Sequence, residues 1–238
     1  MVDAIIILGM HRSGTSCLTG CLSNYGLELG IEPAYSIYNK KGNQENKEVF
    51  RLNEAVLKFN GGSWYEPPRK TLEFDDELEA RRDELLTGYQ SLPKPWGIKD
   101  PRMLLTYPFW ENQLPAHSFI GTFRHPKAVA RSLAARKHMR IPSKQAYKLW
   151  NIYNLKLLER LQTQSFPVIN FDLPPEEYTE NIHGLAEELA LPLKSKESFF
   201  DRKLINQKQY GLKHCPAELR STYQKLLALS QTKRWVCL

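Results

Sequence analysis

The amino-acid sequence predicts an α/β fold in three layers, with a parallel sheet between two layers of helices. The run Ala4–Leu8 is apolar and rich in β-branched residues, which is typical of a strand buried on both faces. A glycine-containing loop and a helical pattern follow this strand directly. Strand and helix patterns then alternate, as in parallel sheets covered by helices. With 238 residues and 42% hydrophobic content, the chain is predicted to form a single domain over residues 1–238.

The other elements are predicted from hydrophobic periodicity and from residues that end helices. Gly26 follows the first helix, and Gly61 with Gly62 follows the second. Ser143 is the predicted N-cap of a long amphipathic helix. Helices are expected over residues 15–25, 45–57, 72–89, 129–134, 143–161, 176–190 and 218–229. Further strands are expected over residues 96–99, 118–123 and 166–171.

Charge is distributed unevenly along the chain. Lys and Arg number 33 against 26 Asp and Glu, a net charge of +7 that favours anionic ligands. Residues 124–160 contain ten Lys or Arg with Glu159 as their only acid, whereas residues 72–86 are mostly acidic. These segments predict surfaces of opposite potential, or else two solvated helix faces. Nucleic-acid binding is not expected, because the basic tract lacks the motifs of the standard readers.

Cysteine spacing and the N-terminal residues predict no metal, disulfide framework or membrane segment. Cys17, Cys21, Cys215 and Cys237 form no CxxC pair and have no zinc-type His spacing. Cys17 and Cys21 lie four residues apart on a predicted helix, where they are expected to fill the core. The first apolar run is too short to span a membrane, and no basic leader precedes it. A cytoplasmic protein without a membrane span is therefore expected.

Residues 9–16 (GMHRSGTS) are predicted to form a phosphate-binding loop, or P-loop. They lie between a buried strand and a helix start, where Gly9 and Gly14 permit turns that point backbone N–H groups at an anion. An ATP-type loop has lysine where Thr15 stands in this chain. Arg12 is therefore the predicted cation of the loop, with a forked guanidinium suited to phosphate or sulfonate oxygens.

A second anion site is predicted at the end of the strand over residues 118–123. Arg124 ends this strand, and Ser132 follows eight positions later on a helix, so both can converge on one phosphate. Lys99 ends another strand and faces the same crevice, or it forms a salt bridge with a nearby acid. Only Asp172 resembles the strand-terminal acid that a magnesium nucleotide requires, so no metal is expected.

Together these motifs resemble the superfamily of sulfotransferases that use 3′-phosphoadenosine-5′-phosphosulfate (PAPS), and more narrowly its bacterial members with a GMHRSGTS opening. The resemblance covers residues 4–135 and rests on the P-loop, on WGIKDPR at 96–102, and on FRHP at 123–126 with Ser132. It implies a sulfotransferase-like P-loop fold and an enzyme that transfers a sulfuryl group to an acceptor hydroxyl. The basic tract over residues 124–160 predicts that this acceptor is a carbohydrate or an anionic small molecule. By the same resemblance, the 5′-phosphosulfate is held by Arg12, Ser13, Gly14, Thr15 and Ser16, and the 3′-phosphate by Arg124 with Ser132.

Sulfuryl transfer needs cations that stabilise the developing charge and a base that accepts the hydroxyl proton. Arg12 and Lys99 are the predicted cations. The resemblance implies Glu45 as the base. The alternative bases are Glu48, His11 and His125.

Other interpretations of the same residues stay open. Trp64 belongs to the core or stacks on a ligand. The loop over residues 30–42 is expected to gate the acceptor, with Lys40 and Lys41 meeting its charge. The alternative functions are a small-molecule kinase, which the missing lysine disfavours, and an anion-binding module that lacks catalysis.

Overall fold

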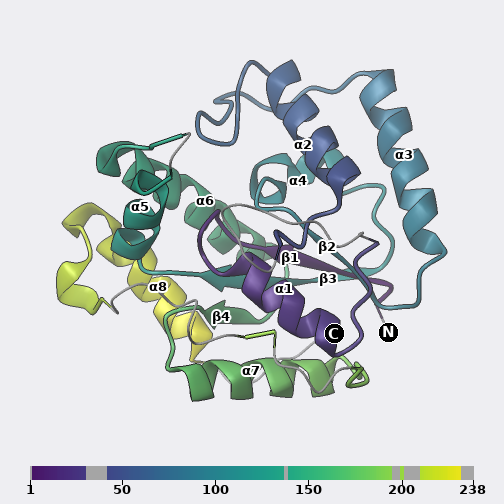
Figure 1. The fold of residues 1–238 in the computed structure, drawn as a ribbon. Helices are drawn as coiled ribbons and strands as arrows, with labels where there is room; N and C mark the ends of the chain where they lie inside the picture. The colour runs from purple at the N-terminus through teal and green to yellow at the C-terminus, as the bar shows by residue number, and fades with distance from the viewer. Residues whose placement is uncertain (1, 31–41, 137–138, 195–198, 201–209, 232–238) are drawn as a thin grey trace.

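The structure is a computed structural model that describes residues 2–30, 42–136, 139–194, 199–200 and 210–231 (Figure 1). It has an α/β fold built on one sheet of four parallel strands. The strands are β1 (Ala4–Leu8), β2 (Trp96–Lys99), β3 (His117–Phe123) and β4 (Val168–Asn170), in the order β2-β1-β3-β4. The three further strands and their parallel pairing agree with the predicted fold class.

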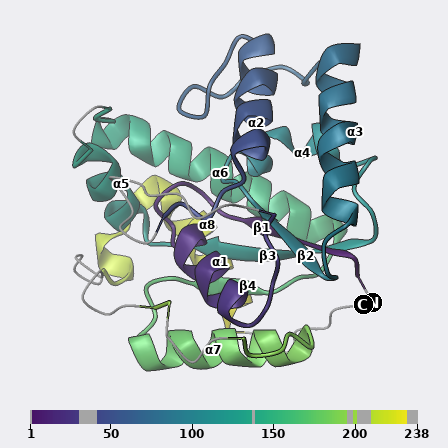
Figure 2. The same cartoon turned by 45° about the vertical axis from the view of Figure 1, so that its right-hand side comes forward.

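Eight α-helices lie among the described residues. They are α1 (Thr15–Asn24), α2 (Lys47–Phe59), α3 (Asp76–Gln90), α4 (Met103–Trp110), α5 (Pro126–Ala134), α6 (Ser143–Thr163), α7 (Pro175–Glu188) and α8 (Arg220–Ser230). Two 3₁₀ turns, Leu212–His214 and Ala217–Leu219, precede α8. Figures 1 and 2 show α1 and α7 together on one face of the sheet, with the other helices around its opposite face and edges.

The two faces of the sheet each support a hydrophobic core, which explains the continuous apolar run of β1. Ile5 and Ile7 pack with residues of α1 and α7, whereas Ile6 and Leu8 pack with residues of α2, α4 and α6. All residues of β1 are fully buried. Because each side chain of the strand meets a helix layer, no position of β1 favours a polar residue.

The structure corrects several predicted boundaries. The helix α4 was not predicted, because seven of its eight residues are buried and its sequence therefore lacks a polar face. The N-cap of α6 is Pro142 rather than Ser143, since the Pro142 carbonyl accepts the first helical hydrogen bond, from the Ala146 N–H. Strand β4 is shorter than predicted. Glu45 lies before α2 rather than within it, because Asn46 caps that helix.

The N-cap of α2 determines where Glu45 lies. Asn46 Oδ1 accepts hydrogen bonds from the Glu48 N–H at 2.8 Å and the Val49 N–H at 3.3 Å, and its Nδ2 donates to the Gly30 carbonyl at 2.6 Å. These bonds start the helix after residue 46 and tie it to the segment that follows α1. Glu45 is thus left in the irregular segment just before α2.

The basic tract over residues 124–160 does not form one patch. It begins directly after β3 and runs through α5 and the 21-residue α6, which places its two ends at opposite edges of the sheet. Arg160 lies near the start of β3, where it pairs with Glu111 at 3.0 Å and covers the ring of Tyr107. The acidic α3 lies on the far side of the molecule from α5 (Figures 1 and 2). Only part of the tract is therefore available to one ligand.

The described cysteines and helices give two further observations. Cys21 is buried and Cys17 half-buried in the core between α1 and α7, as predicted, and neither forms a disulfide with the other or with Cys215. Cys237 lies outside the described residues. In the part of the chain that the structure describes, every helix is too short or too polar to cross a bilayer.

Candidate functional site

The carboxyl ends of three strands place the predicted site residues at one edge of the sheet. The P-loop follows β1, Lys99 ends β2, and Arg124 follows β3. The chain passes from β1 to β2 on one side of it and then to β3 on the other, so the strand order reverses at β1. Open parallel sheets bind their ligands at such a reversal.

The P-loop has the backbone geometry that an oxyanion requires. Gly14 is the N-cap of α1 with φ of 89°, a left-handed conformation that glycine adopts without a steric penalty. It offers no side chain to the first turn of α1, so the N–H groups there have no side-chain cap from this residue. Ser13 Oγ is buried and has no hydrogen-bond partner among the described residues. The loop therefore supplies donors for an anion.

Arg12 connects the P-loop to the second predicted anion site. Its Nε donates a 2.7 Å hydrogen bond to Oγ of Ser132 on α5, although the two residues are 120 positions apart. Burial and the charges of Arg136 and Arg124 lower the pKa of Arg12 to about 10, which still leaves it protonated at neutral pH. Arginines that destabilise one another in this way are relieved by a bound anion.

Arg124 is held in place by residues after β4 and on α6. Its Nε donates to Asp172 Oδ1 at 3.0 Å, and Asp172 Oδ2 accepts the His125 N–H at 2.7 Å. The Arg124 carbonyl accepts from Trp150 Nε1 at 2.9 Å. The carboxylate of Asp172 therefore orients Arg124 at the start of α5.

Lys99 forms the densest set of polar contacts in the site. Its side chain is fully buried, and Nζ donates to Glu45 Oε1 at 2.8 Å, to Ser16 Oγ at 3.1 Å and to the Asn43 carbonyl. Ser16 Oγ donates in turn to the same Asn43 carbonyl at 2.8 Å. The lysine thus joins β2, α1 and the segment before α2. The predicted salt bridge of Lys99 is confirmed, whereas its side chain is fully buried and reaches the crevice through its contacts with Ser16, Asn43 and Glu45.

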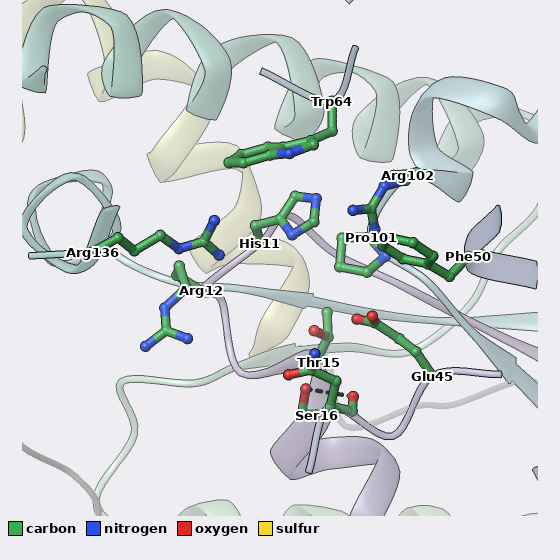
Figure 3. A pocket seen from close by; sticks show the side chains of 11 residues that line it. His11, Arg12, Thr15, Ser16, Glu45, Phe50, Trp64, Pro101, Arg102 and Arg136 are labelled. Atoms are coloured by element: carbon green, nitrogen blue, oxygen red, sulfur yellow. Dashed lines mark hydrogen bonds between the residues drawn. The ribbon is translucent and has the colours of Figure 1, made fainter. Parts of the chain in front are cut away.

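A cavity of about 310 Å³ opens beside the P-loop (Figure 3). Trp64 forms its roof above His11, with ring centroids 4.4 Å apart, and Arg136 and Arg102 lie on opposite sides of His11. Glu45 points into the cavity from the side of Lys99. The cavity is lined by His11, Arg12, Thr15, Ser16, Asn43, Glu45, Phe50, Trp64, Pro101, Arg102 and Arg136.

His11 is a neutral imidazole inside this cavity. Burial lowers its pKa well below 6.5, and the charges of Arg102, Arg136, Lys99 and Arg12 lower it further. Its Nε2 is buried and has no hydrogen-bond partner among the described residues. A hydrogen-bonding group that lacks a partner in a cationic cavity is suited to contact a ligand.

The structure separates the candidate bases. Glu48 points away from the cavity and forms an exposed pair with Arg51 on α2. His125 is buried as the N-cap of α5, where its Nδ1 accepts the Lys127 N–H at 3.1 Å. Glu45 and His11 both line the cavity. Trp64 combines its two predicted roles, because it belongs to the core and also lines the cavity.

Five cavity residues had no predicted role, namely Asn43, Phe50, Pro101, Arg102 and Arg136. Arg102 was a visible part of the WGIKDPR motif, yet nothing in its spacing showed that it would face the loop. Phe50 and Arg136 carry no local signal, since α2 and α5 bring them to the cavity through the fold. Lys40, Lys41 and most of the predicted gating loop lie outside the described residues.

The residues present fit a ligand with two anionic ends such as PAPS. The glycine conformation of the loop, the unpartnered Ser13 Oγ and Arg12 suit one end, and Arg124 with Ser132 suits the other. The sheet edge therefore has donors for both phosphates. Within the described ranges, no group of three or more His, Cys, Asp or Glu side chains is placed to hold a metal ion.

The arrangement of the predicted residues around the cavity bears on the function. Of the residues predicted to bind the cofactor, Arg12, Thr15 and Ser16 line the cavity. Arg124 and Ser132 are not among its lining residues, and Ser132 is connected to it through the hydrogen bond with Arg12. Comparisons of the chain with protein-family models, with curated proteins and with solved structures give no match.

Proposed function

We propose that this protein is a sulfotransferase that moves the sulfuryl group of PAPS to an acceptor hydroxyl. The hydrogen bond between Arg12 and Ser132 supports this most, because it brings two anion-binding motifs together. A ligand with a 5′-phosphosulfate and a 3′-phosphate uses both motifs, whereas a single phosphate uses one. The ATP-type lysine is replaced by Thr15, and Arg12 is the cation of the loop, which supports the same choice.

The proposed roles follow from the contacts of each residue. PAPS, when bound, supplies the sulfuryl group. The first turn of α1 and Arg12 bind its 5′ end, and Arg124 with Ser132 binds the 3′-phosphate. Lys99 and Arg12 stabilise the charge that grows on the leaving phosphate. Lys99 is buried and Arg12 half-buried, which strengthens this interaction because little water screens it.

Glu45 is the proposed general base. It accepts the hydroxyl proton while the acceptor oxygen bonds to sulfur and the bond between sulfur and the phosphate oxygen breaks. Only its Oε1 contacts Lys99, and the carboxylate points into the cavity (Figure 3). A base must lie within reach of the proton that it removes. The cavity beside the loop offers the acceptor that position.

Ligand binding tests the proposal first. We expect 3′-phosphoadenosine-5′-phosphate (PAP) to raise the unfolding temperature without magnesium. The free energy of unfolding should increase by about 2.7 kcal/mol at a hundredfold excess of PAP over its Kd. ATP with magnesium and a mixed oligonucleotide serve as controls. A larger rise in unfolding temperature with ATP and magnesium than with PAP would favour the kinase. A rise with the oligonucleotide alone would contradict the sulfotransferase proposal.

Sulfuryl transfer tests it second. Protein incubated with radiolabelled PAPS is offered neutral glycans, anionic glycans, phenols, tyrosine peptides and lipids. Glu45→Gln should lower the turnover of the best acceptor by about 10²–10⁴-fold and leave PAP affinity nearly unchanged. Glu48→Gln, the matched control on the solvent side of α2, should have normal turnover. Equal rates for both variants would remove Glu45 as the base.

A further inference from the structure

We propose that the cavity beside the P-loop binds an acceptor that carries an anionic group, and that Arg136 and Arg102 recognise this group on either side of His11. The inference rests on the proposed function and names the class of acceptor: a small hydroxylated ring compound with one carboxylate or phosphate. Three observations carry it, namely the charges of the cavity wall, the state of His11, and the size and apolar lining of the cavity.

The wall of the cavity is predominantly cationic. Three arginines line it, and Glu45 is the one acid among the lining residues. That acid is already paired with the buried Lys99. Arg12 belongs to the P-loop, whereas Arg102 and Arg136 come from outside the loop and lie on opposite sides of His11 (Figure 3). The positive charge of the cavity therefore includes groups that are not part of the P-loop.

Arg102 is held rigidly in this wall. Its Nε donates to Glu54, its Nη1 lies 3.2 Å from Asp100 Oδ1, and its guanidinium stands 4.4 Å from the ring centroid of Phe50. Burial lowers the pKa of Arg102, but Asp100 and Glu54 raise it above its usual value. The side chain therefore stays charged and loses little freedom when it contacts a ligand.

Arg136 provides the more adaptable cation. It follows the C-cap of α5, and its guanidinium stands 5.1 Å from the ring centroid of Trp64. Stacking on an indole orients a guanidinium, whose planar edge has the geometry to bind a carboxylate or phosphate. Trp64 therefore positions Arg136 as well as covering His11.

The lowered pKa of His11 indicates a positive electrostatic potential between the two arginines. Among the groups that face it, Arg12, Lys99, Arg102 and Arg136 each disfavour its protonated form, and Tyr153 packs edge-on behind it with ring centroids 6.1 Å apart. Glu45 pairs with Lys99, and Asp100 and Glu54 pair with Arg102, yet all four cations still lower the pKa of His11. An added anion would offset them, and the pKa of His11 would rise on binding.

The size and lining of the cavity limit the acceptor. A volume of about 310 Å³ lies at the lower end for small-molecule sites, which suits one ring rather than an enclosed chain. Phe50, Trp64 and Pro101 give the apolar surface that packs on a sugar or phenol ring. The hydroxyl then faces Glu45, and the anionic group faces the arginines.

The test uses PAP-saturated full-length protein, so that the P-loop is filled and the probes compete only for the cavity. 4-Hydroxybenzoate is titrated against its neutral analogue 4-hydroxybenzamide, and glucuronate against glucose. We expect the anionic member of at least one pair to bind about tenfold to a hundredfold more tightly, and high salt to reduce the difference. The His11 pKa, followed by NMR, should rise with the anionic probe and not with the neutral one.

Two variants and a matched control complete the test. Arg136→Gln should abolish the preference for the anionic probe, and Arg136→Lys should retain part of it. The control Arg160→Gln removes one positive charge at the opposite edge of the sheet and should leave the preference unchanged. Equal affinity for charged and neutral probes, no binding of any probe, or an unchanged preference in Arg136→Gln would each overturn the inference while PAP binding stands. Failure of PAP itself to bind would overturn the proposed function, and the acceptor with it.

Discussion

Lys99→Met is expected to destabilise the protein as well as to lower the rate of the proposed sulfuryl transfer. The variant removes a fully buried ammonium and leaves the Glu45 carboxylate, which is 15% exposed, without its partner at 2.8 Å. Removing one member of a buried ion pair costs about 3–5 kcal/mol. Because Glu45 keeps some contact with water, we expect about 3 kcal/mol. For a chain of this length that corresponds to a fall in Tm of about 6–12 °C.

The assay is urea unfolding of Lys99→Met, Glu45→Gln and the double variant. The two residues contact each other, so the double variant should lose less stability than the sum of the single variants, with a coupling energy of about 1–3 kcal/mol. The pair Glu48 and Arg51, whose side chains are 53% and 61% exposed, is the control and should give a coupling below about 0.5 kcal/mol. Additive effects at Lys99 and Glu45 would refute the reasoning.

Three further predictions follow from the site. Gly14→Ala should lower the free energy of unfolding by about 2–4 kcal/mol, because φ is +89° and a Cβ would lie 2.2 Å from Cδ2 of Phe171. Gly88→Ala, with open space around it on α3, should raise it by about 0.5–1 kcal/mol. Similar unfolding midpoints for the two variants would contradict this. The pKa of His11 lies below 6.5 in the folded protein, so the unfolded chain binds the proton first and the folded state loses stability as pH falls below 6.5. His11→Gln should remove up to about 1.4 kcal/mol per pH unit of that loss. Unfolding curves measured at pH 7 and pH 5 that shift by the same amount in both proteins would argue against this. Arg124→Ala should weaken PAP about tenfold to a hundredfold but adenosine 5′-phosphate little, as measured by calorimetry; equal weakening would assign the arginine a structural role.

Much of the fold could be predicted because its signals are local. The apolar run of β1, the glycines of the P-loop and the residue Gly26 after α1 each reflect a requirement of the backbone or of burial at that position. Parallel strands then place their carboxyl ends at one edge, so the proximity of the P-loop, Lys99 and Arg124 followed from the predicted order of strands and helices. The boundaries that were wrong lie where local signals conflict, as at Pro142 and Ser143.

Within the site, the sequence by itself determined which residue types stand at the ends of the strands, and the tertiary structure decided their partners. Arg12 meets Ser132 across 120 positions, and Lys99 meets Glu45 across 54. The choice of Glu45 over Glu48 depends on the cap at Asn46, which ends the approach to α2 and turns one glutamate inward and the other to solvent. The cationic wall of the cavity depends likewise on how α2, α4 and α5 pack over the sheet. Such contacts join segments far apart in the chain, and no periodic pattern encodes them, because packing is satisfied only when all the elements are in place.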